Sequence, residues 1–170
     1  MFYPKNVQIP TKLEIAKYVL LPITVAEVSY FEYADATGDI PDYDGYLILE
    51  GYIKQHQRGT ALTFFLLDKT SDKPELVGGV HIRPGTHRLE PSGKYQAIVD
   101  FWVTRSKLAD NLDKQILEAL ITWFKQAWAF DQVFFEPEMG YHRTRQMKLF
   151  TEAGLEHKFG YKHGSHPIYG

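Results

Sequence analysis

The sequence contains no cysteine among its 170 residues. This absence excludes disulfide bonds, thiolate metal sites and a cysteine nucleophile together. Because disulfides persist mainly in oxidising compartments, a chain without cysteine is compatible with a reducing one. The N-terminal stretch MFYPKNVQIP also lacks the basic and then apolar layout of a signal peptide. We therefore expect a cytoplasmic protein.

Long apolar runs and an excess of one charge sign are missing as well. No apolar run approaches the roughly 20 residues that a membrane-spanning helix needs. The formal net charge is −2, so no overall field favours nucleic acid or an anionic membrane, and neither partner is expected. Hydrophobic residues make up 44% and charged residues 24% of the chain, which is typical of a globular domain. We expect one domain over residues 1–170, with an N-terminal arm at 1–12 and a C-terminal tail at 163–170.

Hydrophobic periodicity divides the chain into alternating strands and helices. The predicted strands are 13–23, 60–67, 76–83, 95–103, 132–136 and one after residue 155, before an irregular tail. The predicted helices are one after the capping box Thr24-Val25-Ala26-Glu27, then 45–57, one from Leu112, and one from Gly140 to Ala153. This order of elements predicts one mixed α/β layer.

The stretch Ile98–Phe124 reads as a strand, a short polar loop and an amphipathic helix. Asp110 or Asn111 is expected to cap the free N–H groups of the helix, and Asp113 suits its positive end. A strand that leads through a short loop into a helix start is a geometry that binds phosphate.

The segments FWVTRSKLADNLDKQILEAL, WFKQAWAFDQVFFEPE and RTRQMKLFTEAGLE resemble the central half of the GNAT superfamily of acyl-CoA-dependent N-acyltransferases. Glu118-Ala119-Leu120 and Ala153-Gly154-Leu155 match landmarks of that family, and VGGVHIR and YVLLPIT resemble its third and first strands. The resemblance implies a mixed α/β, α+β-like fold. Its mostly antiparallel, twisted sheet would have about six to seven strands, flanked by about four helices.

The pyrophosphate loop departs from the family pattern. Leu112 and Lys114 stand where we place the two glycines of the family, and no glycine lies between Gly93 and Gly140. Glycines allow backbone amides to approach a pyrophosphate closely, so weak CoA binding is expected. On the last helix, Arg143 and Gln146 replace the frequent Asn and Ser, and Phe150 replaces a frequent tyrosine acid.

The resemblance implies acetyl-CoA or another acyl-CoA as co-substrate. The strand backbone would bond to the pantetheine arm, while basic and polar side chains would replace part of the missing amide cradle. The residues expected to contact the donor are Phe101, Trp102, Val103, Arg105, Ser106, Lys107, Asn111 and Arg143.

Asp100 is the first candidate for catalysis. Strand alternation places it on one face with Ile98 and Trp102, and burial among apolar groups raises a carboxyl pKa toward the range of a general base. By resemblance, the family often has an acidic base on this strand. A surface acid, or a carboxylate paired with Arg83 or Arg105, is the alternative.

Three further catalytic candidates follow the strand that ends near Pro137. Glu136 lies in an EPE segment that also contains Glu138, and this segment resembles one in some members of the family. Tyr141 and His142 follow, and either could protonate a leaving thiolate with a pKa of ~8.5.

The seven histidines do not predict a metal site, since no pair has the helical spacing of metal ligands. Aromatic residues make up 15% of the chain, which fits either an aromatic core or an aromatic-lined cleft. By resemblance, the first two helices form a wall of the acceptor cleft. The tyrosines expected on or near that wall are Tyr30, Tyr33, Tyr43, Tyr46 and Tyr52.

Three functions remain open from the sequence. The first is acyl transfer to an amine or hydroxylamine of a small molecule or peptide, by direct attack in a ternary complex. The second is a binding protein that keeps the fold without the chemistry. The third is an acyltransferase with a non-CoA donor, such as an acyl carrier protein. Fold alone does not choose among them, and either a monomer or a homodimer is compatible with the sequence.

Overall fold

The protein is described here by a computed structural model that covers residue 3 and residues 8–38, 43–70, 72–85, 95–138, 142–159 and 167–170. The strands are β1 (Leu13–Ile15), β2 (Tyr18–Pro22), β3 (Leu62–Asp68), β4 (Glu75–Pro84), β5 (Gln96–Val103), β6 (Gln132–Phe135), β7 (His157–Phe159) and β8 (Ile168–Tyr169). The helices are α1 (Tyr30–Thr37), α2 (Tyr43–Arg58), α3 (Leu112–Ala127) and α4 (Arg143–Glu152), with a 3-10 turn η1 (Arg105–Lys107).

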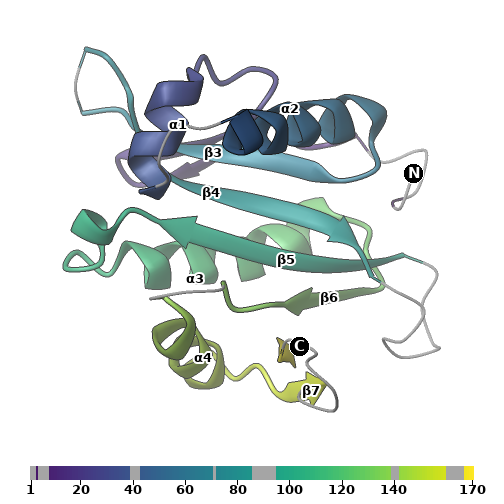
Figure 1. Ribbon diagram of the computed structural model, residues 1–170. Coiled ribbons are helices and arrows are strands. Elements are labelled where there is room, and N and C mark those ends of the chain that lie inside the picture. Colours follow the sequence, from purple (N-terminus) through teal and green to yellow (C-terminus); the bar gives the residue numbers. More distant parts are fainter. Residues whose placement is uncertain are drawn as a thin grey trace.

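One eight-stranded sheet runs through the molecule in the order β1-β2-β3-β4-β5-β6-β8-β7 (Figure 1). Neighbouring strands are antiparallel except β5 and β6, which are parallel. The fold is therefore the predicted mixed α/β type with a mostly antiparallel sheet. Within the described residues the sheet has eight strands, where about six to seven were expected.

Helices cover both faces of the sheet. α1 and α2 lie on the near side of the view, and α3 lies behind the sheet (Figure 1). The alternation of β5 follows this division: Val99, Phe101 and Val103 are buried in the core that contains α3 residues, whereas Trp102 packs with the cluster that contains residues of α1 and α2. The predicted assignment of the two faces of this strand is confirmed.

The predicted boundaries fail mainly near the ends of the chain. The stretch predicted as one strand, 13–23, is a hairpin of β1 and β2, with Ala16 in the left-handed region at φ 52°. The capping box predicted at Thr24 is wrong. Ser29 caps α1 and forms the box with Glu32, because the amides of Val25 and Ala26 bond back to Pro22 in a turn.

The tail predicted to be irregular contributes a strand. Tyr169 of β8 pairs with Phe135 of β6 and with His157 of β7, so the last residues lie between two strands that precede them in the chain. Tyr169 is buried, with its ring centroid 5.3 Å from that of Phe150. This contact joins the C-terminus to the core.

Two consecutive glycines of β4 are required by the strand beside them. Gly79 is the cross-strand partner of Trp102, and a Cβ on Gly79 would lie 2.7 Å from the indole nitrogen. A Cβ on Gly78 would lie 2.6 Å from the carbonyl oxygen of Trp102. Gly79 therefore makes the space in which the Trp102 indole lies against the sheet, and Gly78 lets the two strand backbones approach closely.

Gly79→Ala is expected to lower the free energy of unfolding by about 1–3 kcal/mol, because the methyl group overpacks the Trp102 indole. The matched control is Gly51→Ala on α2, where an added Cβ meets nothing within 4 Å. That change should raise the free energy of unfolding by about 0.5–1 kcal/mol, since alanine favours a helix interior over glycine. Urea unfolding followed by circular dichroism measures both. Equal effects of the two variants would contradict the steric role of Gly79.

Candidate functional site

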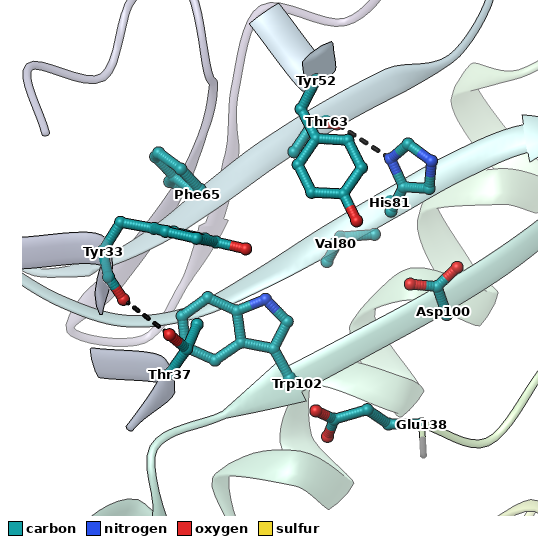
Figure 2. A pocket seen from close by; sticks show the side chains of 10 residues that line it. All are labelled: Tyr33, Thr37, Tyr52, Thr63, Phe65, Val80, His81, Asp100, Trp102 and Glu138. Atoms are coloured by element: carbon teal, nitrogen blue, oxygen red, sulfur yellow. Dashed lines mark hydrogen bonds between the residues drawn. The ribbon is translucent and has the colours of Figure 1, made fainter. Parts of the chain in front are cut away.

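A cavity of about 230 Å³ opens on the sheet face that α1 and α2 cover. Its walls come from α1, α2, three neighbouring strands and the segment after β6, and Figure 2 shows their side chains turned toward a common space. The lining residues are Tyr33, Thr37, Tyr52, Thr63, Phe65, Val80, His81, Asp100, Trp102 and Glu138. The predicted base Asp100 is therefore in this cavity.

Asp100 is a carboxyl group with an altered ionisation. Burial raises its pKa to about 6, and the nearby Arg83 guanidinium opposes that rise. Arg83 Nε lies 3.7 Å from Asp100 Oδ2, and the Asp100 side chain keeps 32% of its surface exposed. Both sequence interpretations hold in part, because the carboxylate faces a cavity and is also paired with Arg83. A carboxyl group with this pKa accepts a proton near neutral pH better than an ordinary aspartate does.

Arg83 is shared with a second carboxylate. It also forms an ion pair with Glu136, whose side chain is only 13% exposed. Glu136, a predicted catalytic residue, is absent from the cavity wall, and its observed contact is with Arg83. Glu138, two residues further on, supplies the second carboxylate of the cavity. Both acids of the EPE segment follow the end of β6 at Phe135, so strand alternation does not govern their surroundings.

His81 lies beside Asp100 as its cross-strand partner. Burial, and then the charge of Arg83, lowers the pKa of His81 to about 4, so the ring is neutral at pH 7. Its Nδ1 lies 2.9 Å from Thr63 Oγ1, and its ring centroid lies 4.8 Å from that of Tyr52. The alternation of VGGVHIR, paired with that of β5, is the signal that places His81 next to Asp100.

Aromatic rings form much of the remaining wall. Tyr33 from α1 and Tyr52 from α2 reach toward the sheet, where Trp102 lies (Figure 2). The rings of Tyr33 and Trp102 are 6.3 Å apart in a T-shaped arrangement. Trp102, predicted to contact the donor, thus lines the cavity. Ring faces next to carboxylates form an environment that attracts a small organic cation.

The loop before α3 differs from the arrangement predicted for its glycines. Leu112 and Lys114 lie in the first turn of α3, and the left-handed backbone position of the loop is Asn111, at φ 53°. The Asn111 side chain does not cap the helix, contrary to prediction. Its Oδ1 instead accepts a hydrogen bond of 3.0 Å from Arg145 Nη2.

A carboxylate of the protein itself lies at the start of α3. Asp113 is fully buried and forms an ion pair with Arg145 of α4, which also donates from Nη2 to Asp113 Oδ1 at 3.0 Å. The same Oδ1 accepts the backbone N–H of Lys114 at 3.0 Å. The helix start that we predicted for phosphate therefore already contains a negative group and its counter-ion.

The edge of β5 beyond β6 is bonded to α4. The parallel pairing of β5 with β6 ends at Val99, whose carbonyl accepts the N–H of Glu136 at 2.9 Å. Further along β5, the carbonyls of Phe101 and Val103, both predicted to bond to pantetheine, accept from Gln146 Nε2 at 2.7 Å and from His142 Nε2 at 2.8 Å.

His142 is buried inside this contact. Burial lowers its pKa, and its Nε2 must carry the proton that it donates to the Val103 carbonyl, because a carbonyl can only accept. The side chain is absent from the cavity wall, so the geometry gives no support to its predicted role as an acid. Tyr141, the other predicted acid, lies outside the described residues.

The basic side chains predicted to contact phosphate have different surroundings. Lys107 lies 3.2 Å from the buried carboxylate of Asp68, and only 16% of its side chain is exposed. Arg105 and Ser106 are exposed on η1, and Arg143 is the first residue of α4 and half-buried. Lys107 therefore has a structural partner, and the roles of the other three residues stay predictions.

Taken together, these contacts do not fit the diphosphate of CoA at the start of α3. The predicted amide site holds the Asp113 carboxylate, and Arg145 is bonded to that carboxylate. A second anion there would meet a like charge whose counter-ion is already engaged.

Within the described residues, no group of three or more metal-ligating side chains could hold a metal ion. No helix in the described part of the chain has both the length and the apolar character needed to cross a membrane.

The raised pKa of Asp100 predicts a pH-dependent stability. The folded-state pKa of about 6 exceeds the 3.8 of an unperturbed aspartate, so folding favours the protonated form. The corresponding stabilisation is complete below about pH 4 and is lost as pH rises through about 6, a change of about 1–2 kcal/mol after allowance for solvent screening. Asp100→Asn should remove this change, whereas Glu118→Gln, which removes an exposed carboxylate of α3, is the control. Urea unfolding at several pH values measures this effect. The same pH dependence of the free energy of unfolding in wild type and Asp100→Asn would contradict the prediction.

No family model and no curated protein matches the chain. Solved structures do. RimL, a ribosomal L7/L12 alpha-N-protein acetyltransferase, aligns with a TM-score of 0.61 and 13% identity over 93% of this chain and 94% of its own. The ribosomal-protein-S5-alanine acetyltransferase from Vibrio fischeri gives 0.61 and 13% over 94% and 95%. The microcin C7 self-immunity acetyltransferase MccE gives 0.58 and 15% over 95% and 96%. At these identities the likeness concerns the fold, and the chain has the GNAT fold that its motifs indicate.

Proposed function

We propose that the protein is an N-acyltransferase that moves an acyl group from a thioester to an amine, with Asp100 as general base. The observation that carries this proposal is a carboxyl group with a pKa of about 6 in an aromatic-walled cavity, next to the point where β5 continues without β6. The similar structures add support, since all three have acetyltransferase names, and MccE was solved with acetyl-CoA and AMP.

The charge balance of the cavity favours a cationic acceptor before reaction. Asp100 and Glu138 are carboxylates on its wall, Arg83 is shared with Glu136, and His81 is neutral at pH 7. An ammonium group is attracted by the carboxylates and by the faces of aromatic rings. The cavity volume of about 230 Å³ suits a small amine or the amino end of a longer molecule.

The proposed reaction needs one proton acceptor and no covalent enzyme intermediate. The ammonium first loses one proton to bulk water. The amine nitrogen then attacks the thioester carbonyl carbon, and the carbon–sulfur bond breaks. Asp100, directly or through one water, takes the second proton that the nitrogen releases, and the leaving thiolate takes up one proton from water to become the thiol, so that one proton is released overall. Correct positioning of amine and thioester supplies much of the rate enhancement in such a ternary complex. An acetyl group is the proposed acyl group, with acetyl-CoA as the first donor to test.

Asp100→Asn should lower turnover by 10²–10⁴-fold, the usual contribution of a general base, with thioester binding unchanged. Because the base must be ionised, the wild-type rate should rise with pH through about 6 and then level off. That rise should vanish in the variant. Thiol release from acetyl-CoA, with a panel of small amines and of peptides with a free N-terminus, measures both effects. Glu118→Gln, which removes a distant carboxylate, is the matched control.

Two results would contradict the proposal. A variant that keeps full turnover on the best acceptor removes Asp100 from the mechanism. An amine that binds the cavity tightly and is never acylated by any thioester would favour a binding protein over an enzyme.

A further inference from the structure

The start of α3, where we expected a phosphate group of the donor, holds the ion pair of Asp113 and Arg145 instead. This ion pair bears on which donor the protein accepts. We propose that Asp113 and Arg145 take the place of a donor diphosphate, so that the protein recognises its thioester without the nucleotide. Asp113 is then the residue that sets donor specificity. This inference rests on the proposed acyl transfer.

Asp113 already satisfies the helix start in the way an anion would. Its carboxylate is fully buried, accepts the backbone N–H of Lys114 at 3.0 Å, and lies against the positive end of α3. Arg145 binds both of its oxygens, through Nε and through Nη2. A diphosphate would have to displace this buried carboxylate before it could accept the Lys114 N–H.

Arg145 also binds the loop to α4. Besides Asp113, its Nη2 donates to Asn111 Oδ1 at 3.0 Å and lies 3.4 Å from the carbonyl oxygen of Leu108. These contacts join the loop before α3 to α4. The approach of a large anion to the loop would therefore break several contacts at once.

The neighbouring cations have their own carboxylates. A surface pocket of about 310 Å³ beside this site includes Lys114, Arg145 and Lys148 in its wall. Lys114 lies 4.0 Å from Glu118, and Lys148 lies 3.7 Å from Glu152. Each basic side chain of the pocket thus faces an acid, and the pocket offers a diphosphate little net positive charge.

Unlike the nucleotide, the thioester arm of a donor has a hydrogen-bond acceptor to bind on the protein, at the edge of β5. The carbonyl of Phe101 accepts one bond from Gln146 of α4, and a carbonyl oxygen has two lone pairs. An amide N–H of a pantetheine-like arm can therefore share this oxygen next to Asp100. The inferred donor is a thioester held by this arm, whether or not a nucleotide is attached.

The deciding experiment compares acetyl-CoA with acetyl-pantetheine by titration calorimetry on the wild-type protein. We expect dissociation constants within about twofold of each other, and no greater salt dependence for acetyl-CoA. Acetyl-CoA binding about tenfold or more tightly would overturn the inference and leave the proposed acyl transfer intact. Binding of neither thioester would overturn both.

The variant Asp113→Asn provides the second part of the test. The amide keeps an oxygen for the Lys114 N–H but releases the charge of Arg145, so acetyl-CoA should gain about tenfold over acetyl-pantetheine and become salt-dependent. Asp110→Asn, an exposed acid of the same loop, is the matched control and should give no such gain. A folded Asp113→Asn protein without the gain, or an equal gain in both variants, would overturn the inference. If Asp113→Asn does not fold, the wild-type comparison decides.

Discussion

The parting of β5 from β6 is the constraint on which the rest of the site depends. The two strands are paired in parallel only from Gln96 to Val99, and β6 ends at Phe135, ahead of the buried Pro137. Proline has no N–H to continue a ladder, so β5 runs on alone on that side. Asp100 and Trp102 are the first residues past this point that face α1 and α2, and the Phe101 and Val103 carbonyls become available to α4. The candidate acceptor cavity and the proposed donor edge therefore share one short stretch of strand.

Electrostatics then distinguishes the two sides of this stretch. On the cavity side, Arg83 is divided between Asp100 and Glu136, so it only partly offsets the burial that raises the pKa of Asp100. On the other side, Asp113 has Arg145 in close contact and a backbone N–H as well. Asp100 can exchange a proton near neutral pH, whereas Asp113 is buried in an ion pair with Arg145. The same residue type is thus the candidate base in one place and part of a structural ion pair in the other.

The resemblance in fold and the differences in detail have different physical origins. A sheet of this order with helices on both faces is specified by many apolar positions, so it tolerates an identity of only 13–15% to the similar acetyltransferases. The donor side depends on a few polar groups at a loop and a helix start, where single substitutions change the chemistry. In this protein Arg145 bonds to Asn111 and Asp113 at the helix start where the sequence motif suggested a bound phosphate.

Local pattern determined much of the fold. The helical period of about 3.6 residues in the apolar positions from Leu112 predicts α3. The alternation in IVDFWV predicts which side chains of β5 share a face, and Gly154 ends α4 at φ 80°. These features depend on neighbours a few residues away, so the sequence alone identifies them. The face of Asp100 and Trp102, and with it the candidate base, was therefore predictable.

Only the tertiary structure decided what those side chains meet. Asp113 and Arg145 are 32 residues apart, Val103 and His142 are 39 apart, and Phe101 and Gln146 are 45 apart. Sequence periodicity does not predict such contacts, because they depend on how α4 packs against the sheet and α3. The same holds for Tyr169, which completes the sheet from the end of the chain. The sequence by itself thus determined the elements and the face of the catalytic candidate, and long-range packing decided which polar groups are engaged and which remain available for a substrate.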